Sequence, residues 1–148
     1  MLRLRRLGIL LAALAALSLL ATTRTRASSV SFRVIVNAGN GASALDRKFL
    51  ADAFLKKTTR WPGGELIRPV DLGTESSTRR RFSEDVLSRS VPAVKSYWQQ
   101  MIFSGRAVPP PELDSDDEVI RYVTKYAGAV GYISGAVDAP GVKVMAVR

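Results

Sequence analysis

One short run of the sequence gathers hydroxyl and basic side chains where a helix is expected to begin. Residues 76–79 read Ser-Ser-Thr-Arg. The start of a helix leaves backbone N–H groups without partners, and its dipole favours negative charge there. The hydroxyls of Ser76, Ser77 and Thr78 and the guanidinium of Arg79 would add hydrogen bonds to a bound oxyanion. The chemistry indicated is non-covalent capture of a small anion.

The same residues also fit a simpler role in the helix itself. Serine and threonine are common N-caps, and capping is the default interpretation of such a run. Arg80 and Arg81 would then face water, and Glu75 would place a negative charge beside the helix start. On the residues alone, an anion site and a plain helix cap both remain open.

The composition narrows the possible chemistry. The sequence has no cysteine and no histidine, which excludes disulfides, Cys or His catalysis and most zinc sites. The acidic cluster Asp114, Asp116, Asp117 and Glu118 is typical of the first turn of a helix. We therefore expect no enzyme, no metal and no cofactor, although an enzyme that uses carboxylates alone remains a third possibility.

Residues 1–27 have the layout of a secretory signal peptide. Three arginines at positions 3, 5 and 6 precede an apolar run from Leu7 to Ala21, and small residues follow. Thr25 and Ala27 suit a cleavage site after Ala27. The apolar run is shorter than the ~20 residues that comfortably span a bilayer. We expect a periplasmic or secreted protein that touches the membrane only through this segment, if it is left uncleaved as an anchor.

The leader also explains much of the net charge of +9. Five of its residues are arginines and none is acidic, so residues 28–148 hold 17 basic and 13 acidic residues and a net charge of +4. Neither tryptophan lies within a dense basic pattern of the kind that binds nucleic acid. We expect no nucleic-acid partner.

Residues 28–148 are long enough for one domain with a core of its own. Hydrophobic spacing and turn residues predict strands and helices in alternation, which indicates an α/β sheet covered by helices. The expected strands are 32–36, 66–70, 129–134 and 142–147. Four helices are expected. The first is capped by Ser43 and runs through Lys57, and the second begins at Thr78. The third has Pro92 in its first turn, and the fourth is capped by Asp114 or Ser115 and ends at Gly128. Ligands of such sheets tend to lie where strand ends meet helix starts, which is the place of residues 72–82.

Three aromatic residues are better interpreted as packing groups than as ligand contacts. Trp61, although close to Lys56 and Lys57, is expected to pack over the turn that follows it, since cations are usual at a helix end. Tyr97 and Trp98 lie at helical spacing from Val94 and Met101, which favours a core position.

Several longer motifs resemble a known family. VIVNAGNGASALDRKFLADAFLKKTTRWPGGELIRPVDL, ESSTRRRF, SYWQQMIFSGRAVPPP and AGAVGYIS together resemble the short phosphate ABC transporter substrate-binding-like proteins. These proteins are related to one lobe of the type II periplasmic binding fold. The resemblance covers most of residues 32–136 and implies a mixed sheet flanked by helices. It further implies that phosphate or a similar oxyanion binds at Ser76, Ser77, Thr78 and Arg79, with an ABC permease or another envelope protein as partner.

The chain departs from the family pattern at the expected site. In full-length receptors the loop reads roughly Arg-x-Asp-Gly-Ser-Gly-Thr, but here Leu72 and Thr74 stand where the arginine and aspartate would be, and Glu75 replaces a glycine. A chain of this length also provides one lobe, and an open site keeps its ligand in water, where charged contacts are weaker. These departures favour an alternative: an accessory or sensory interaction module of the envelope that has kept the fold and lost the ligand.

Overall fold

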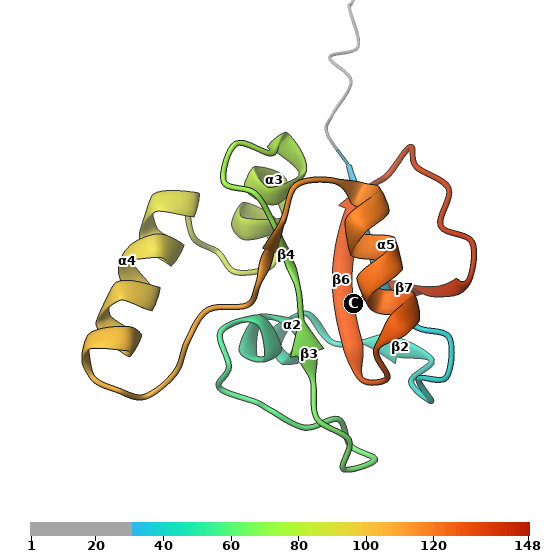
Figure 1. Cartoon of the computed structure of the whole chain (residues 1–148), viewed down its shortest axis with the longest axis horizontal. Helices are drawn as coiled ribbons and strands as arrows, with labels where there is room; N and C mark the ends of the chain where they lie inside the picture. The colour runs from blue at the N-terminus through green and yellow to red at the C-terminus, as the bar shows by residue number, and fades with distance from the viewer. Residues whose placement is uncertain (1–30) are drawn as a thin grey trace, which may run out of the picture.

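The computed structural model describes residues 31–148, whose centre is a five-stranded mixed sheet in the order β2-β7-β1-β6-β3 (Figure 1). β1 (Phe32–Asn37) is central and runs antiparallel to β6 (Ala129–Ser134) and β7 (Val142–Val147). The short edge strands β2 (Ala44–Leu45) and β3 (Arg68–Pro69) run parallel to β7 and β6. The sheet curls into a half-barrel, and the mixed α/β fold predicted from the sequence is confirmed.

A separate two-stranded ribbon lies beside the sheet. β4 (Asp71–Leu72) pairs in parallel with β5 (Glu112–Leu113), so that Asp71 is opposite Glu112. The chain between them carries α3 (Ser77–Asp85) and α4 (Val91–Phe103). Residues 73–111 therefore form an excursion whose two ends lie side by side.

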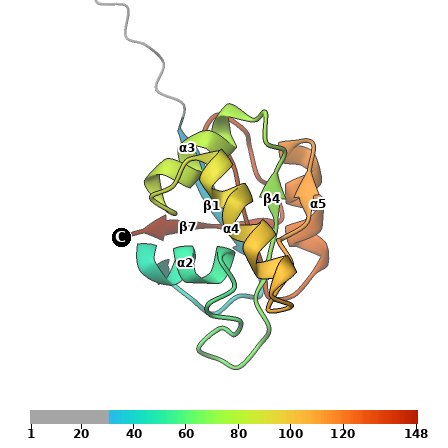
Figure 2. The same cartoon turned by 90° about the vertical axis from the view of Figure 1, so that its left-hand side faces the viewer.

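Helices cover both faces of the sheet. α5 (Asp116–Lys125) packs on β6 and β1, while α2 (Arg47–Phe54) and α3 lie on the other face. α4 packs chiefly on α3 and stands at the left edge of the fold in Figure 1, the side that faces the viewer in Figure 2.

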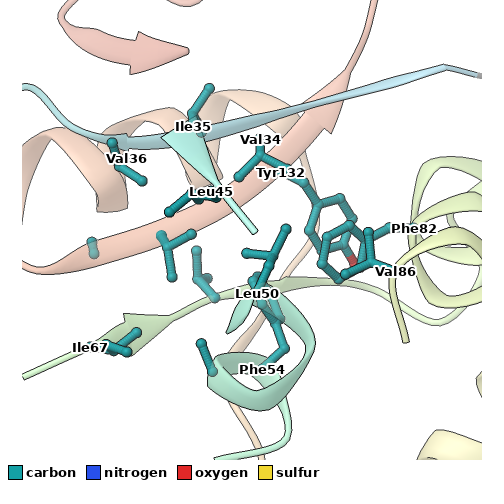
Figure 3. Packing of buried hydrophobic residues seen from close by; sticks show 14 of the residues in the cluster. Val34, Ile35, Val36, Leu45, Leu50, Phe54, Ile67, Phe82, Val86 and Tyr132 are labelled. Atoms are coloured by element: carbon teal, nitrogen blue, oxygen red, sulfur yellow. The ribbon is translucent and has the colours of Figure 1, made fainter. Parts of the chain in front are cut away.

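An aromatic cluster forms the core between the sheet and the helices α2 and α3 (Figure 3). The rings of Phe82 and Tyr132 stack with centroids 3.9 Å apart and planes 6° apart. Phe54 lies 4.7 Å from Phe82, measured between ring centroids. All three side chains are almost completely buried. This packing fixes α3 against strand β6, and with it the position of the α3 start.

The opposite face of β6 accommodates α5 through a glycine. A Cβ atom on Gly131 would meet Val119 Cγ1 at 2.7 Å and Val70 Cγ1 at 2.9 Å. Only hydrogen fits at this position without displacing neighbours. α5 and Val70 therefore approach β6 closely at this position.

Two boundaries of the first predicted helix were wrong. Asp46, not Ser43, caps α2, because its Oδ1 accepts the N–H of Phe49 at 3.0 Å. Ala44 and Leu45 instead pair with β7, since the sheet needs an edge strand at this point. The helix ends at Phe54 rather than Lys57, and Lys56 takes a positive φ of 53° in the turn that follows.

The remaining predicted elements occur close to their expected places. The strand expected over 66–70 is reduced to β3, where Pro69 lies at the sheet edge as proline requires. Ser90 caps α4 with Pro92 in its first turn, and Ser115 caps α5, whose first turn is acidic. α5 ends at Lys125 rather than at Gly128, which has a positive φ of 72° in the following turn.

The core position expected for Trp98 is confirmed, whereas Tyr97 is only partly buried. Trp61 and Trp98 are buried, and the Nε1–H of Trp61 donates to the carbonyl of Gly128 at 3.0 Å. Tyr97 is half-buried and donates its hydroxyl hydrogen to the carbonyl of Leu55 at 2.8 Å.

The predicted leader, residues 1–27, lies outside the described residues. Between residues 31 and 148, no helix combines the length and the apolar character that crossing a bilayer requires.

Candidate functional site

The start of α3 combines a serine cap with free backbone donors. Ser76 is the N-cap, and its Oγ accepts the N–H of Arg79 at 3.2 Å. Within the described residues no acceptor pairs with the N–H groups of Ser77 and Thr78. Ser77 is exposed, whereas Thr78 is buried. The cap is therefore real, and it leaves two backbone donors at the positive end of the helix dipole.

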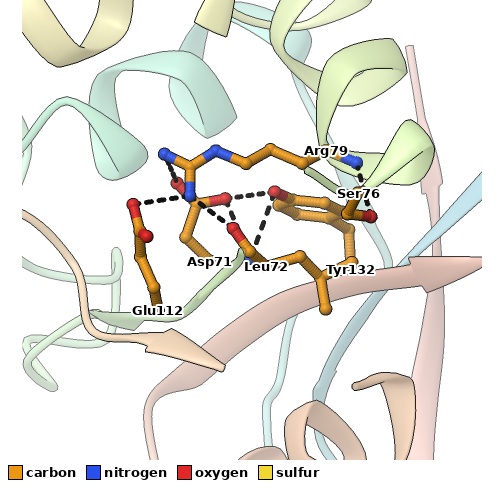
Figure 4. Close-up of polar contacts among 6 residues, drawn as sticks. All are labelled: Asp71, Leu72, Ser76, Arg79, Glu112 and Tyr132. Atoms are coloured by element: carbon orange, nitrogen blue, oxygen red, sulfur yellow. Dashed lines mark hydrogen bonds and ion pairs between the residues drawn. The ribbon is translucent and has the colours of Figure 1, made fainter. Parts of the chain in front are cut away.

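The side chain of Arg79 turns away from this start and into the protein (Figure 4). Its Nη2 lies 3.1 Å from Asp71 Oδ2, and its Nη1 lies 2.7 Å from Glu112 Oε1. Nη1 also donates to the carbonyl of Leu72. Arg79 is only 4% exposed, and its Nε is buried without an acceptor in the described part of the chain. The guanidinium thus clamps α3 to both strands of the β4–β5 ribbon.

Asp71 is the centre of this polar network. The hydroxyl of Tyr132 donates to Asp71 Oδ1, and the N–H of Leu72 lies 3.1 Å from the same oxygen. Burial raises the pKa of Asp71 above its usual value, against the opposing effect of Arg79. Burial, with the charge of Asp71 next, also raises the pKa of Tyr132. Arg79 therefore forms ion pairs with two carboxylates, of which Asp71 is buried and Glu112 is half exposed.

The structure brings the four predicted residues together on one turn but gives them different surroundings. Ser76 and Ser77 lie at the end of α3 that faces solvent. Thr78 is buried in the first turn of the helix, and the Arg79 side chain forms ion pairs inside the protein. Glu75, expected to weaken an anion site, is exposed and makes no hydrogen bond with the α3 start in the described residues. The helix entrance is thus not closed by this carboxylate.

Sequence reasoning did not identify Asp71, Glu112 and Tyr132 as partners of Arg79. A weak signal existed for Asp71, because it directly follows the predicted strand 66–70, and an aspartate that is buried beside such a strand needs a partner. No signal pointed to Glu112, which lies 33 positions away from Arg79 in the chain. Only the parallel pairing of β4 with β5 brings it close.

Cavities also occur elsewhere in the described residues, away from the α3 start. The described residues contain no cluster of three acidic side chains arranged to hold a metal. Two cavities, of about 470 and about 370 Å³, lie between α2 and residues 86–89 and beside Trp61. Neither is lined by residues 76–79.

Comparison with known proteins identifies the fold. No protein-family model matches the sequence, and no curated protein matches it either. Among solved structures, an ABC-type phosphate transport receptor from Vibrio cholerae is similar, with 22% identity and a TM-score of 0.61. A putative phosphate ABC transporter substrate-binding protein with bound phosphate from Clostridium perfringens has 22% identity and a TM-score of 0.62. PstS from Borrelia burgdorferi has 13% identity and the same TM-score of 0.62.

These similarities cover 80% of this chain but only 46%, 45% and 47% of the three structures. The chain thus spans less than half the length of the proteins it resembles. At these identities the match establishes the fold alone. The described chain therefore has the fold of a single lobe of a periplasmic-binding protein, as found in phosphate-transport receptors.

Proposed function

We propose that this protein is an exported, non-catalytic solute-binding protein that binds phosphate or a similar oxyanion weakly at the start of α3. The observation that carries the proposal is the pair of free N–H groups of Ser77 and Thr78 at a helix start that Glu75 leaves open. Such donors, with the helix dipole behind them, bind anions without any further cation. The likeness of the fold to phosphate-transport receptors supports the same ligand class.

The four residues have separate roles in this proposal. Ser76 holds the helix start in shape as its cap, while Ser77 and Thr78 supply backbone N–H groups and hydroxyls to the anion. Arg79 contributes positive charge from the interior side of the helix start. Because this guanidinium points away from the helix start and is paired with Asp71 and Glu112, most of its charge is neutralised before an anion binds. This neutralisation keeps the affinity low.

An NMR titration of residues 28–148 with phosphate and with sulfate tests the proposal. We expect the amide resonances of Ser77 and Thr78 to shift on addition of millimolar anion. The variant Ser77→Pro removes one N–H donor at a position where proline suits a helix, since Ser76 already has an extended ψ of 127°. Ser77→Ala removes only the hydroxyl.

We expect Ser77→Pro to weaken the shifts more than Ser77→Ala does. Unchanged amide resonances near Ser76 at millimolar phosphate and sulfate would refute the proposal.

A second candidate function is favoured by the pairing of Arg79. Asp71 and Glu112 together neutralise this cation, as expected if the lobe has lost its ligand and serves as an accessory or sensory interaction module. The variants Ser77→Pro and Arg79→Lys separate the two functions. In a ligand-free module, a stoichiometric complex with an envelope protein such as an ABC permease would survive Ser77→Pro, and phosphate would have no effect on it.

Export is part of the proposal and rests on the leader-like residues 1–27. The structural relatives are phosphate-transport receptors, which fits a periplasmic or secreted location. N-terminal sequencing of the protein from the periplasmic fraction should give Ser28 as the first residue. Recovery of the intact N-terminus in the membrane fraction would instead support an uncleaved anchor.

A further inference from the structure

The C-terminal end of α4 and the loop that follows it present apolar side chains to solvent. Phe103 is 92% exposed, Val108 is 62% exposed and Ile102 is 51% exposed. We call Ile102, Phe103, Arg106 and Val108 the α4 tip. Three large apolar side chains exposed within seven residues of the chain make this region a candidate interaction surface.

Positive charge accompanies the apolar groups of the α4 tip. Residues 86–111 contain no aspartate and no glutamate. Lys95 and Arg106 are exposed, and neither forms an ion pair with another described residue. Lys95 precedes Ile102 by seven positions, so the two lie on the same side of the helix, two turns apart. The tip is therefore both apolar and basic.

The packing of α4 on its neighbours leaves the α4 tip facing solvent. α4 buries Val94 and Trp98 against its neighbours, and Tyr97 ties it to the carbonyl of Leu55. The opposite side of α4 faces away from the rest of the molecule (Figures 1 and 2). Three successive prolines, 109–111, stiffen the segment that returns to β5. Phe103 thus lies at the surface and does not pack against the core.

We propose that the α4 tip docks on an anionic lipid surface. Phe103, Ile102 and Val108 enter the boundary between headgroups and acyl chains, while Arg106 and Lys95 contact lipid phosphates. A bilayer offers negative charge and apolar depth in the same place, which matches both properties of the tip. A single, almost fully exposed Phe needs no preformed groove to enter lipid. This docking does not depend on anion binding at α3.

Co-sedimentation with lipid vesicles tests the proposal. The chain from Ser28 onward is used, because it contains every described helix and strand and lacks the apolar leader. We expect binding to vesicles of phosphatidylcholine and phosphatidylglycerol, weakened by salt, and much weaker binding to phosphatidylcholine alone. Phe103→Ser should reduce the affinity about tenfold or more, since a buried aromatic ring is lost. Arg106→Glu should reduce it roughly tenfold on anionic vesicles.

Matched controls lie elsewhere on the surface. Leu66→Ser removes an apolar side chain that is 49% exposed, and Arg121→Glu reverses a charge on α5 whose side chain is 70% exposed. Both variants should bind vesicles as the unaltered protein does. Circular dichroism confirms that each variant is folded.

A second measurement, fluorescence quenching, detects insertion of the α4 tip directly and does not rely on a variant that loses binding. In Phe103→Trp, brominated phosphatidylglycerol should quench the fluorescence of the new tryptophan, while Trp61 and Trp98 stay unquenched because they are buried. Absence of binding to anionic vesicles would overturn the proposal, as would full binding by Phe103→Ser or an unquenched Phe103→Trp. Self-association that requires Phe103, seen by sedimentation velocity without vesicle binding, would assign the tip to a second copy of the chain instead.

Discussion

The hydroxyl of Tyr132 donates a hydrogen bond to the carboxylate of Asp71, which joins strand β6 to the β4–β5 ribbon inside the protein (Figure 4). Tyr132 also stacks on Phe82 of α3. One side chain therefore links the aromatic core to the polar network around Arg79. The position of the α3 start depends on both.

Replacing Tyr132 with phenylalanine should preserve the stacking and remove this hydrogen bond. The buried carboxylate of Asp71 loses a donor, so we expect the free energy of unfolding to fall by about 1–3 kcal/mol. Tyr97→Phe is the matched control, because the hydroxyl of Tyr97 bonds a neutral carbonyl at a half-buried position. It should cost about 1 kcal/mol or less. Urea denaturation measures both values, and equal losses would contradict the special role of Asp71.

Replacing Arg79 with methionine should be one of the most damaging single changes. Asp71 would be left buried without its cation, a loss of about 3–5 kcal/mol. The double variant Asp71→Asn with Arg79→Met removes the unpaired charge and should recover part of this loss. Chemical denaturation of the two single variants and the double variant gives the coupling energy. Additive effects of the two substitutions would show that the 3.1 Å ion pair between Arg79 and Asp71 contributes little to stability.

The raised pKa of Asp71 predicts a specific dependence of stability on pH. Its carboxyl holds a proton more tightly in the folded protein than in the unfolded chain, where the usual pKa is 3.8. The stability that this group contributes is complete below about pH 4 and is lost as the pH rises through the folded-state pKa. The unfolding free energy of the unaltered protein should thus fall relative to that of Asp71→Asn as the pH rises above about 4. A difference that rises with pH would mean that Arg79 outweighs burial.

Replacing Gly131 with alanine should disturb the contact between β6 and α5. The added methyl group would overlap Val119 and Val70, so we expect a loss of about 1–3 kcal/mol. Gly41→Ala is the control, because nothing lies within 4 Å of its added carbon. Thermal unfolding should separate the two variants clearly. A neutral Gly131→Ala would mean that α5 can shift outward without cost.

The caps of α3 and α4 offer a paired test of stability against binding. Ser76→Ala and Ser90→Ala each remove one capping hydroxyl and should each cost about 0.5–2 kcal/mol. Only Ser76→Ala should also weaken the phosphate-induced shifts, because only α3 presents the proposed anion site. Equal phosphate-induced shifts in the two variants would show that the Ser76 cap plays no part in anion binding.

The sequence predicted most of the fold because its strongest signals are local. Apolar spacing identified β1, β6, β7 and the cores of all four described helices, and turn residues identified most of the breaks. The edge strand β2 was missed, since two residues carry no period and pair only because β7 lies beside them. The cap of α2 was misplaced by three residues for the same reason, as Ser43 and Asp46 are both good caps in isolation.

The candidate site was predicted only in part. Ser76, Ser77 and Thr78 could be placed at a helix start from local pattern alone. The engagement of Arg79 could not be foreseen, because its partners Asp71 and Glu112 come from a parallel ribbon with no sequence signature. A basic residue in a first turn usually faces water, and only the tertiary fold turns this one inward.

The pairing of Asp71 with Glu112 means that the chain leaves the body of the fold at Leu72 and re-enters it at the adjacent position. α3 is fixed within this excursion by Phe82 and Arg79, but α4 rests chiefly on α3 and forms no part of the sheet. Detachment of α4 would therefore break no strand pairing. Its amide hydrogens should exchange with solvent well before those of β1 and β6, which makes α4 the least protected helix of the excursion and a segment able to open while the rest of the lobe stays folded.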